Sequence, residues 1–142
     1  MERSTGRNEF DLYALDVTQR TYAHLAQKAA RVIGAGFTAV VDATFLTCAQ
    51  RDEFRRLAAQ LGVLFTILAC RAHAETLRRR VALRSAQGTD ASEADLPVLS
   101  GQFAALGPLT AEEQADALTI DTDAPQASQR LLDAVHAMGV EP

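Results

Sequence analysis

The stretch "VVDATFLTCAQR", residues 40–51, brings together a carboxylate, two hydroxyls and a guanidinium: Asp42, Thr44, Thr47 and Arg51. Asp42 ends an apolar run. A carboxylate there is costly to leave half desolvated, so we expect it to meet a cation, a metal-bound water or a hydroxyl. The alternative is structural, with Asp42 capping the neighbouring turn or pairing with an arginine. Together these groups indicate a site for a charged ligand at the end of a strand.

A second set of candidates lies in the arginine-rich helix that follows the next apolar run. Leu77 and Val81 mark the inward face of this helix, and Arg80 and Arg84 lie on the same side at helical spacing. Guanidinium groups on a buried seam need carboxylates or phosphates as partners. Two interpretations stay open: a structural salt-bridge network, or a site that grips polyphosphate. The partners to consider are Asp42, Asp90, Asp95, Asp121 and a bound phosphate.

The cysteines and histidines give weaker signals. Cys48 falls in the first turn of a predicted helix, where the helix dipole favours a thiolate, but no histidine is close in sequence. His24, His73 and His136 are dispersed along predicted helices, and a solvent-facing or capping role is expected for each. Two cysteines form no disulfide framework, and no Cys/His cluster has zinc-ligand spacing, so no metal site is expected.

Hydrophobic periodicity, glycine stops and capping patterns predict the elements that position these residues. Gly36 and Gly62 are expected to end two of the helices, and Thr110 with Glu113 forms a capping box. The predicted helices cover residues 16–34, 47–61, 73–87, 92–106, a short stretch after 110, and 125–139; the predicted strands cover 37–43, 63–70 and 117–121.

Strands separated by helices predict βαβ crossovers and therefore an α/β fold, with helices on both sides of a short parallel sheet. In an open parallel sheet, ligands bind outside the carboxyl ends of the strands. Asp42, Arg71 and Asp121 lie at those ends. We therefore expect the functional site at this edge of a three-layer α/β/α sandwich.

Composition limits the partners. The chain has 142 residues, 48% of them hydrophobic, which suits one core. We expect an N-terminal tail over residues 1–15 and a single α/β domain over 16–142. The net charge of −4 argues against nucleic-acid binding, which usually requires a basic surface. No apolar run is long enough to span a bilayer and residues 1–15 lack a signal-peptide core, so no membrane partner and a cytoplasmic location are expected.

The sequence resembles the P-loop kinase-like ATPases, the AAA-type ATP-binding domains that are often joined to an aminoglycoside-phosphotransferase-like domain. Zeta toxin and gluconate kinase are more distant relatives. The resemblance spans roughly residues 12–123. The segments that carry it are "TYAHLAQKAARVIGAGFTAVVDATFL", "RDEFRRLAAQLGVLFTILACRA", "LRRRVALRSAQGTDASEADLPVLSGQ" and "PLTAEEQADALTIDT".

The resemblance implies roles for individual residues. The position of Asp42 implies contact with the phosphate acceptor or the magnesium shell, and that of Arg51 implies a hold on the substrate. Arg80 and Arg84 match lid arginines that close over the ATP phosphates, with "GTDASEAD" as the mobile segment behind them. The expected site therefore has Asp42 and Arg51 as catalytic residues, and Arg80, Arg84 and Thr44 as contacts to MgATP.

The sequence departs from this family at the phosphate loop. The fold cradles phosphate with GxxxxGK[ST], yet the only lysine is Lys28, in a predicted helix with no glycine before it. We expect the first strand and the P-loop upstream of residue 1, and we expect this chain alone to bind ATP weakly and to lack kinase activity. Their absence would also leave an apolar sheet edge, which predicts a homo-oligomer.

The leading hypothesis is thus the C-terminal part of an ATP-binding, kinase-like P-loop protein that phosphorylates a small hydroxylated acceptor. Two alternatives stay open. One is a non-catalytic interaction domain that oligomerises through its exposed sheet edge. The other is a subunit that receives its P-loop in trans from a partner chain. The sequence does not identify the acceptor.

Overall fold

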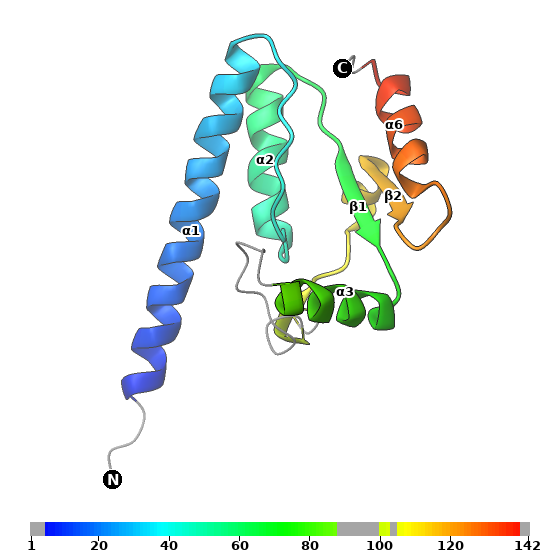
Figure 1. Cartoon of the computed structure of the whole chain (residues 1–142). Coiled ribbons are helices and arrows are strands. Elements are labelled where there is room, and N and C mark those ends of the chain that lie inside the picture. Colours follow the sequence, from blue (N-terminus) through cyan, green and yellow to red (C-terminus); the bar gives the residue numbers. More distant parts are fainter. Residues whose placement is uncertain (1–4, 88–99, 103–104, 140–142) are drawn as a thin grey trace. The chain divides into compact units, whose positions relative to one another are not determined.

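A computed structural model of the chain describes residues 5–87, 100–102 and 105–139 (Figure 1). Helices dominate, and two short strands form a parallel sheet. The elements are α1 (Thr5–Gly34), α2 (Cys48–Leu61), β1 (Ile67–Arg71), α3 (Ala74–Gln87), α5 (Ala111–Ala115), β2 (Ala117–Asp121) and α6 (Ala127–Ala137).

The chain divides into two compact units. The first comprises the described residues of Met1–Phe45 together with Ala49–Leu64, and so contains α1 and nearly all of α2. The second comprises Leu46–Cys48 and the described residues of Phe65–Pro142, and contains the sheet with α3, α5 and α6. The expectation of a single domain over residues 16–142 stays a prediction.

The core of the first unit is built around three aromatic rings. Tyr22 from α1, Phe54 from α2 and Phe45 from the loop between them meet edge to face, with ring centroids 5.1 to 6.5 Å apart. Tyr22 and Phe54 are buried, as are Ala29 and Ala58 one or two turns further along the same helices. Burial of a ring of this size contributes about 1.5–3 kcal/mol, so these contacts account for much of the packing of this unit.

Glycines end both helices of the first unit, as predicted. Beyond α1, Gly36 has a φ of +87° and its N–H donates to Ile33 O at 2.9 Å. Beyond α2, Gly62 has a φ of +67°, and the N–H of Val63 donates to Ala58 O at 3.1 Å. A left-handed glycine satisfies the last free carbonyls of a helix in this way. The start of α1 differs from the prediction, because the helix begins at Thr5 and not at Asp16.

The second unit contains the predicted parallel sheet, formed by two of the three predicted strands. β1 and β2 pair in parallel register from Ile67 opposite Ala117 to Arg71 opposite Asp121, and α3 and α5 lie between them in sequence. This arrangement confirms the α/β class. α5 has the predicted capping box: the Glu113 N–H donates to Thr110 Oγ1 at 3.2 Å, and the Thr110 N–H donates to Glu113 Oε2 at 2.8 Å.

One strand prediction was wrong, and a second predicted strand is present but begins later than predicted. Residues 37–43 form no strand in the described structure, and Phe37 and Val40 are 70% and 82% exposed. A strand needs a neighbour for its hydrogen bonds, and an apolar run without one cannot form a ladder. β1 begins at Ile67 instead of Val63, because the Val63 N–H is used to close α2. Most of the helix predicted over 92–106 lies outside the described residues.

Candidate functional site

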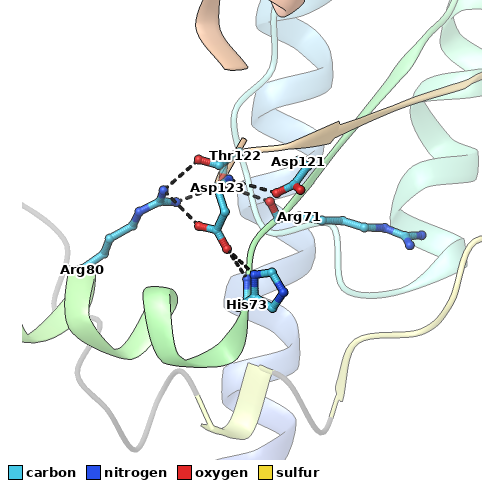
Figure 2. Close-up of polar contacts among 6 residues, drawn as sticks. All are labelled: Arg71, His73, Arg80, Asp121, Thr122 and Asp123. Atoms are coloured by element: carbon cyan, nitrogen blue, oxygen red, sulfur yellow. Dashed lines mark hydrogen bonds and ion pairs between the residues drawn. The ribbon is translucent and has the colours of Figure 1, made fainter. Parts of the chain in front are cut away.

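The candidate site lies at the carboxyl end of the sheet in the second unit. The strands end at Arg71 and Asp121, which are partners in the parallel register. Just beyond β2, Thr122 and Asp123 form a turn that meets two residues from the region of α3, His73 and Arg80 (Figure 2). Because parallel strands end at the same edge, side chains far apart in sequence converge there.

Thr122 joins the end of β1 to the guanidinium of Arg80. Its N–H and its hydroxyl both donate to Arg71 O, at 2.7 and 3.0 Å. In return Thr122 accepts two hydrogen bonds from Arg80: NH1 donates to Thr122 Oγ1 at 2.9 Å and NH2 donates to Thr122 O at 3.0 Å. The turn therefore orients one edge of the Arg80 guanidinium against the sheet.

Asp123 divides its two carboxylate oxygens between Arg80 and His73. Oδ1 lies 3.6 Å from Arg80 NH2. Oδ2 accepts from the backbone N–H of His73 at 2.7 Å and lies 2.7 Å from its ring nitrogen Nδ1. The N–H of Asp123 itself donates to Asp121 Oδ1 at 2.9 Å, which fixes the turn. One carboxylate thus holds a guanidinium and an imidazole side by side.

The pair of Asp123 and His73 has shifted acidity. The hydrogen bond and the charge of Asp123 raise the pKa of His73 above its usual 6.5, with a smaller contribution from Asp121. The pKa of Asp123 is lowered below 3.8, chiefly by hydrogen bonds from the His73 backbone and ring, and further by the Thr76 side chain. Both shifts favour the charged forms, so the contact strengthens as an ion pair when His73 is protonated.

The Arg80 guanidinium has hydrogen-bond donors that the contacts with the turn do not use. A guanidinium has five N–H donors, and the contacts to Thr122 and Asp123 occupy only the edge that faces the turn. The Arg80 side chain is 43% exposed, so an oxyanion can approach the remaining donors. Within the described ranges, no three His, Cys, Asp or Glu side chains are placed to hold a metal ion. The site therefore has the chemistry of a phosphate contact beside a titratable imidazole.

Three predicted site residues lie in the first unit. Asp42 is exposed. The Thr44 hydroxyl lies 3.3 Å from the Tyr22 hydroxyl. Arg51 is only 5% exposed, and its NH1 donates to Phe45 O at 2.9 Å. This contact holds the backbone directly after Thr44. The assigned catalytic and nucleotide-binding roles of the three residues stay predictions.

The arginines of α3 depart from the buried seam that was predicted. Val81 is buried, but Arg80 and Arg84 are both exposed. The reason is that Arg80 meets Thr122 and Asp123 at the rim of the sheet, where it needs no burial to find its partners. Neither partner was among those considered from the sequence. Asp90 and Asp95, with the segment "GTDASEAD", lie outside the described residues.

Sequence reasoning missed three residues of the site: His73, Thr122 and Asp123. A signal for two of them was present, because "TD", residues 122 and 123, follows directly on the strand that ends at Asp121. Polar residues immediately after a parallel strand belong to the ligand-binding edge. His73 gave no comparable signal, since its setting depends on a carboxylate fifty residues away.

A parallel sheet with polar residues gathered at its carboxyl edge defines an α/β fold. A family model described as an AAA domain matches residues 1–109, which is most of the chain. The chain therefore belongs to the AAA domain family, a nucleotide-binding class. The match ends before β2, so Thr122 and Asp123 lie outside it.

Comparisons with curated proteins and with solved structures found no match. Within the part of the chain that the structure describes, no helix is both long and apolar enough to cross a membrane.

Proposed function

We propose that this chain contributes the arginine-bearing part of a kinase-like nucleotide site, which transfers the γ-phosphate of MgATP to a small hydroxylated acceptor. The observation that carries the proposal is the fixed guanidinium of Arg80 at the carboxyl end of β1 and β2. This is the edge where open α/β sheets bind their ligands. A preorganised arginine stabilises phosphoryl charge without reorganisation during transfer. Membership of the AAA domain family supports a nucleotide as the ligand.

The other predicted residues take supporting roles in this proposal. Arg84, which follows Arg80 by one turn on α3, adds positive charge near the phosphates. Asp42 supplies a carboxylate for the magnesium shell or for the acceptor hydroxyl, with Thr44 beside it as a nucleotide contact. The contact of Arg51 with the Phe45 carbonyl supports a role in shaping the 42–45 segment around the acceptor.

The phosphate-cradling motif GxxxxGK[ST] does not occur in this sequence. The proposal therefore assigns the cradle to another segment or subunit, and it predicts weak binding of MgATP by this chain alone. A dissociation constant of about 1 mM corresponds to only about 4 kcal/mol, which a few arginine contacts can supply. Reading the coding region immediately upstream tests the assignment: an in-frame GxxxxGK[ST] supports it, and a stop codon favours a partner subunit as the source of the loop.

Weak binding is measurable by NMR. In the isotope-labelled chain, MgATP added to millimolar concentration should shift the side-chain N–H signal of Arg80 and the backbone signals of Thr122. Arg80→Ala should weaken the binding about tenfold, the effect of losing a charge-assisted hydrogen bond. Arg79→Ala is the matched control, because Arg79 is an exposed arginine on the same helix outside the cluster.

The proposal fails if the two substitutions have equal effects, or if no signal of the cluster responds to MgATP. Micromolar binding by the wild-type chain would instead contradict the expectation that the cradle lies elsewhere. Replacing MgATP by MgCl2 alone separates a nucleotide effect from an effect of the ion.

A second candidate function is that of a non-catalytic domain that self-associates. Its support is the exposed apolar surface: Phe37, Val40 and Leu64 are 70%, 82% and 91% exposed, and each strand of the described sheet has one unpaired edge. Unpaired strand edges and exposed apolar side chains both favour association. Light scattering should then show a dimer or larger species that dissociates in Leu64→Lys. A monomer at high micromolar concentration would contradict this candidate.

A further inference from the structure

One carboxylate in the second unit holds both a histidine and an arginine, and the function proposed above uses only the arginine. Asp123 Oδ2 lies 2.7 Å from His73 Nδ1, and Asp123 Oδ1 lies 3.6 Å from Arg80 NH2 (Figure 2). Phosphotransfer to a hydroxyl needs a group that stabilises phosphoryl charge and a neighbouring group that takes the proton. Asp123 contacts both such groups, the His73 imidazole and the Arg80 guanidinium, and so holds them next to each other.

The contact with Asp123 determines which ring nitrogen of His73 is basic. An ionised carboxylate only accepts hydrogen bonds, so the neutral ring must carry its proton on Nδ1 and its lone pair on Nε2. The His73 backbone N–H donates to the same oxygen at 2.7 Å, which fixes the residue as well as the ring. The His73 side chain is 83% exposed, and Figure 2 shows the far edge of the ring directed away from Asp123.

The charges around the ring favour proton uptake near neutral pH. Asp123 lies after β2, Asp121 ends β2, Arg80 lies on α3 and Arg71 ends β1. The Arg71 side chain extends away from the cluster in Figure 2, so the two carboxylates dominate. They raise the pKa of His73. A general base works best when its pKa lies near the working pH, and this shift moves the imidazole in that direction from 6.5.

We propose that His73 is the proton acceptor of the phosphotransfer site and that Asp123 is the positioning residue that holds it beside Arg80. This inference rests on the proposed function. In the transfer, the acceptor oxygen bonds to the γ-phosphorus as the bond from that phosphorus to the β,γ-bridging oxygen breaks, and ADP leaves with the bridging oxygen. The hydroxyl proton passes to His73 Nε2, which later releases it to water.

A purely structural role for the contact makes a different prediction. Asp123 accepts the His73 N–H just before α3 begins, so it also caps that helix from across the turn. A structural contact fixes the same tautomer, because the 2.7 Å distance between Asp123 Oδ2 and His73 Nδ1 is the same in both cases. If capping were its whole purpose, however, a bound nucleotide would leave the titration of His73 unchanged.

The tautomer is tested on the full chain without nucleotide. Long-range proton–nitrogen NMR spectra should show Nδ1 protonated and Nε2 unprotonated in the neutral ring of His73. Asp123→Asn should mix the tautomers and return the pKa of His73 toward 6.5, while Asp133→Asn, an exposed change of equal charge on α6, should do neither. A neutral ring with its proton on Nε2 in the wild-type chain overturns the inference.

Proximity to the phosphate is tested by repeating the titration with millimolar MgATP. A bound triphosphate should raise the pKa of His73 further, because nearby negative charge favours the imidazolium. Arg79→Ala should keep this rise, and Arg80→Ala should lose it. If Arg80 responds to MgATP but the titration of His73 does not move, the inference is wrong and the proposed function stands. If neither residue responds, the proposed function fails and the inference fails with it.

Discussion

Replacing Tyr22 by phenylalanine is a sharp test of how the first unit is built. The change deletes one buried oxygen and keeps the ring. That oxygen accepts the Phe45 N–H at 2.9 Å and lies 3.3 Å from Thr44 Oγ1. On the other side of the same residue, Phe45 O accepts from Arg51 NH1. Phe45 has a φ of +45°, a conformation that L-residues adopt at a cost, so these two side chains hold a strained peptide in place.

The expected loss follows from the contacts. Tyr22→Phe removes a hydrogen bond worth roughly 1 kcal/mol and leaves the half-buried Phe45 N–H without its acceptor, for a total of about 1–2 kcal/mol. The edge-to-face contacts with Phe45 and Phe54, at 5.3 and 6.5 Å, remain. Tyr22→Ala removes these as well, and its expected cost rises to about 3–5 kcal/mol.

Urea unfolding of the full chain, followed by circular dichroism, measures the difference. For Tyr22→Phe the midpoint should fall by roughly 0.5–1 M at unchanged slope, since small proteins lose about 1–3 kcal/mol per molar urea. Thr21→Ala is the control, because its hydroxyl makes an exposed bond to Val17 O on the same helix. If Tyr22→Phe lowers the midpoint no more than the control does, the hydrogen bond from the Phe45 N–H to Tyr22 does not stabilise this unit as argued.

Two further predictions concern the second unit. Glu113→Ala removes the buried half of the capping box of α5 and should lower the free energy of unfolding by about 1 kcal/mol in the same urea assay; an unchanged midpoint would contradict it. The pair of His73 and Asp123 should stabilise the fold most between pH 4 and pH 6.5. Because the pKa of His73 is raised in the folded state, the stability that His73 contributes is complete below pH 6.5 and is lost as the pH rises through the folded-state pKa. Because the pKa of Asp123 is lowered, the stability that Asp123 contributes is present above pH 3.8 and is lost as the pH falls through the folded-state pKa. The midpoint difference between wild type and Asp123→Asn should therefore be larger at pH 5 than at pH 9, and a constant difference would rule this out.

The local features of the fold could be predicted from the sequence because each depends on a few adjacent residues. Gly62 ends α2 and the box of Thr110 and Glu113 starts α5, as their spacing indicated. The parallel pairing of β1 with β2 followed from apolar runs separated by helical patterns. The run over 37–43 is also largely apolar but forms no strand, because pairing depends on a neighbour that composition does not reveal.

In the candidate site, too, the local features could be predicted from the sequence and the long-range contacts could not. The sequence located Arg80 on α3 and expected partners for it, yet Thr122 and Asp123, which contact it, were not among the partners named. Helical periodicity predicts on which face of the helix an arginine lies. It does not predict which residue of a distant turn contacts that arginine. A guanidinium can reach several Å along a rim, so neighbouring positions such as Asp121 and Asp123 are indistinguishable by pattern. Only the register of β1 with β2 decides that the turn after Asp121 faces α3.

Two of the three arginines that the sequence singled out, Arg51 and Arg80, therefore differ in what they can still bind. Arg51 is buried, and it holds the carbonyl of the strained Phe45, so a ligand that took this guanidinium would release the backbone it supports. Arg80 contacts Thr122 and Asp123 with one edge only and is partly exposed, so it can bind an anion without losing what orients it. An arginine held in this way fits transition-state stabilisation, since its orientation is established before the ligand arrives. By this reasoning Arg80→Ala should weaken MgATP binding about tenfold at little cost in folding, whereas Arg51→Ala should act first on stability.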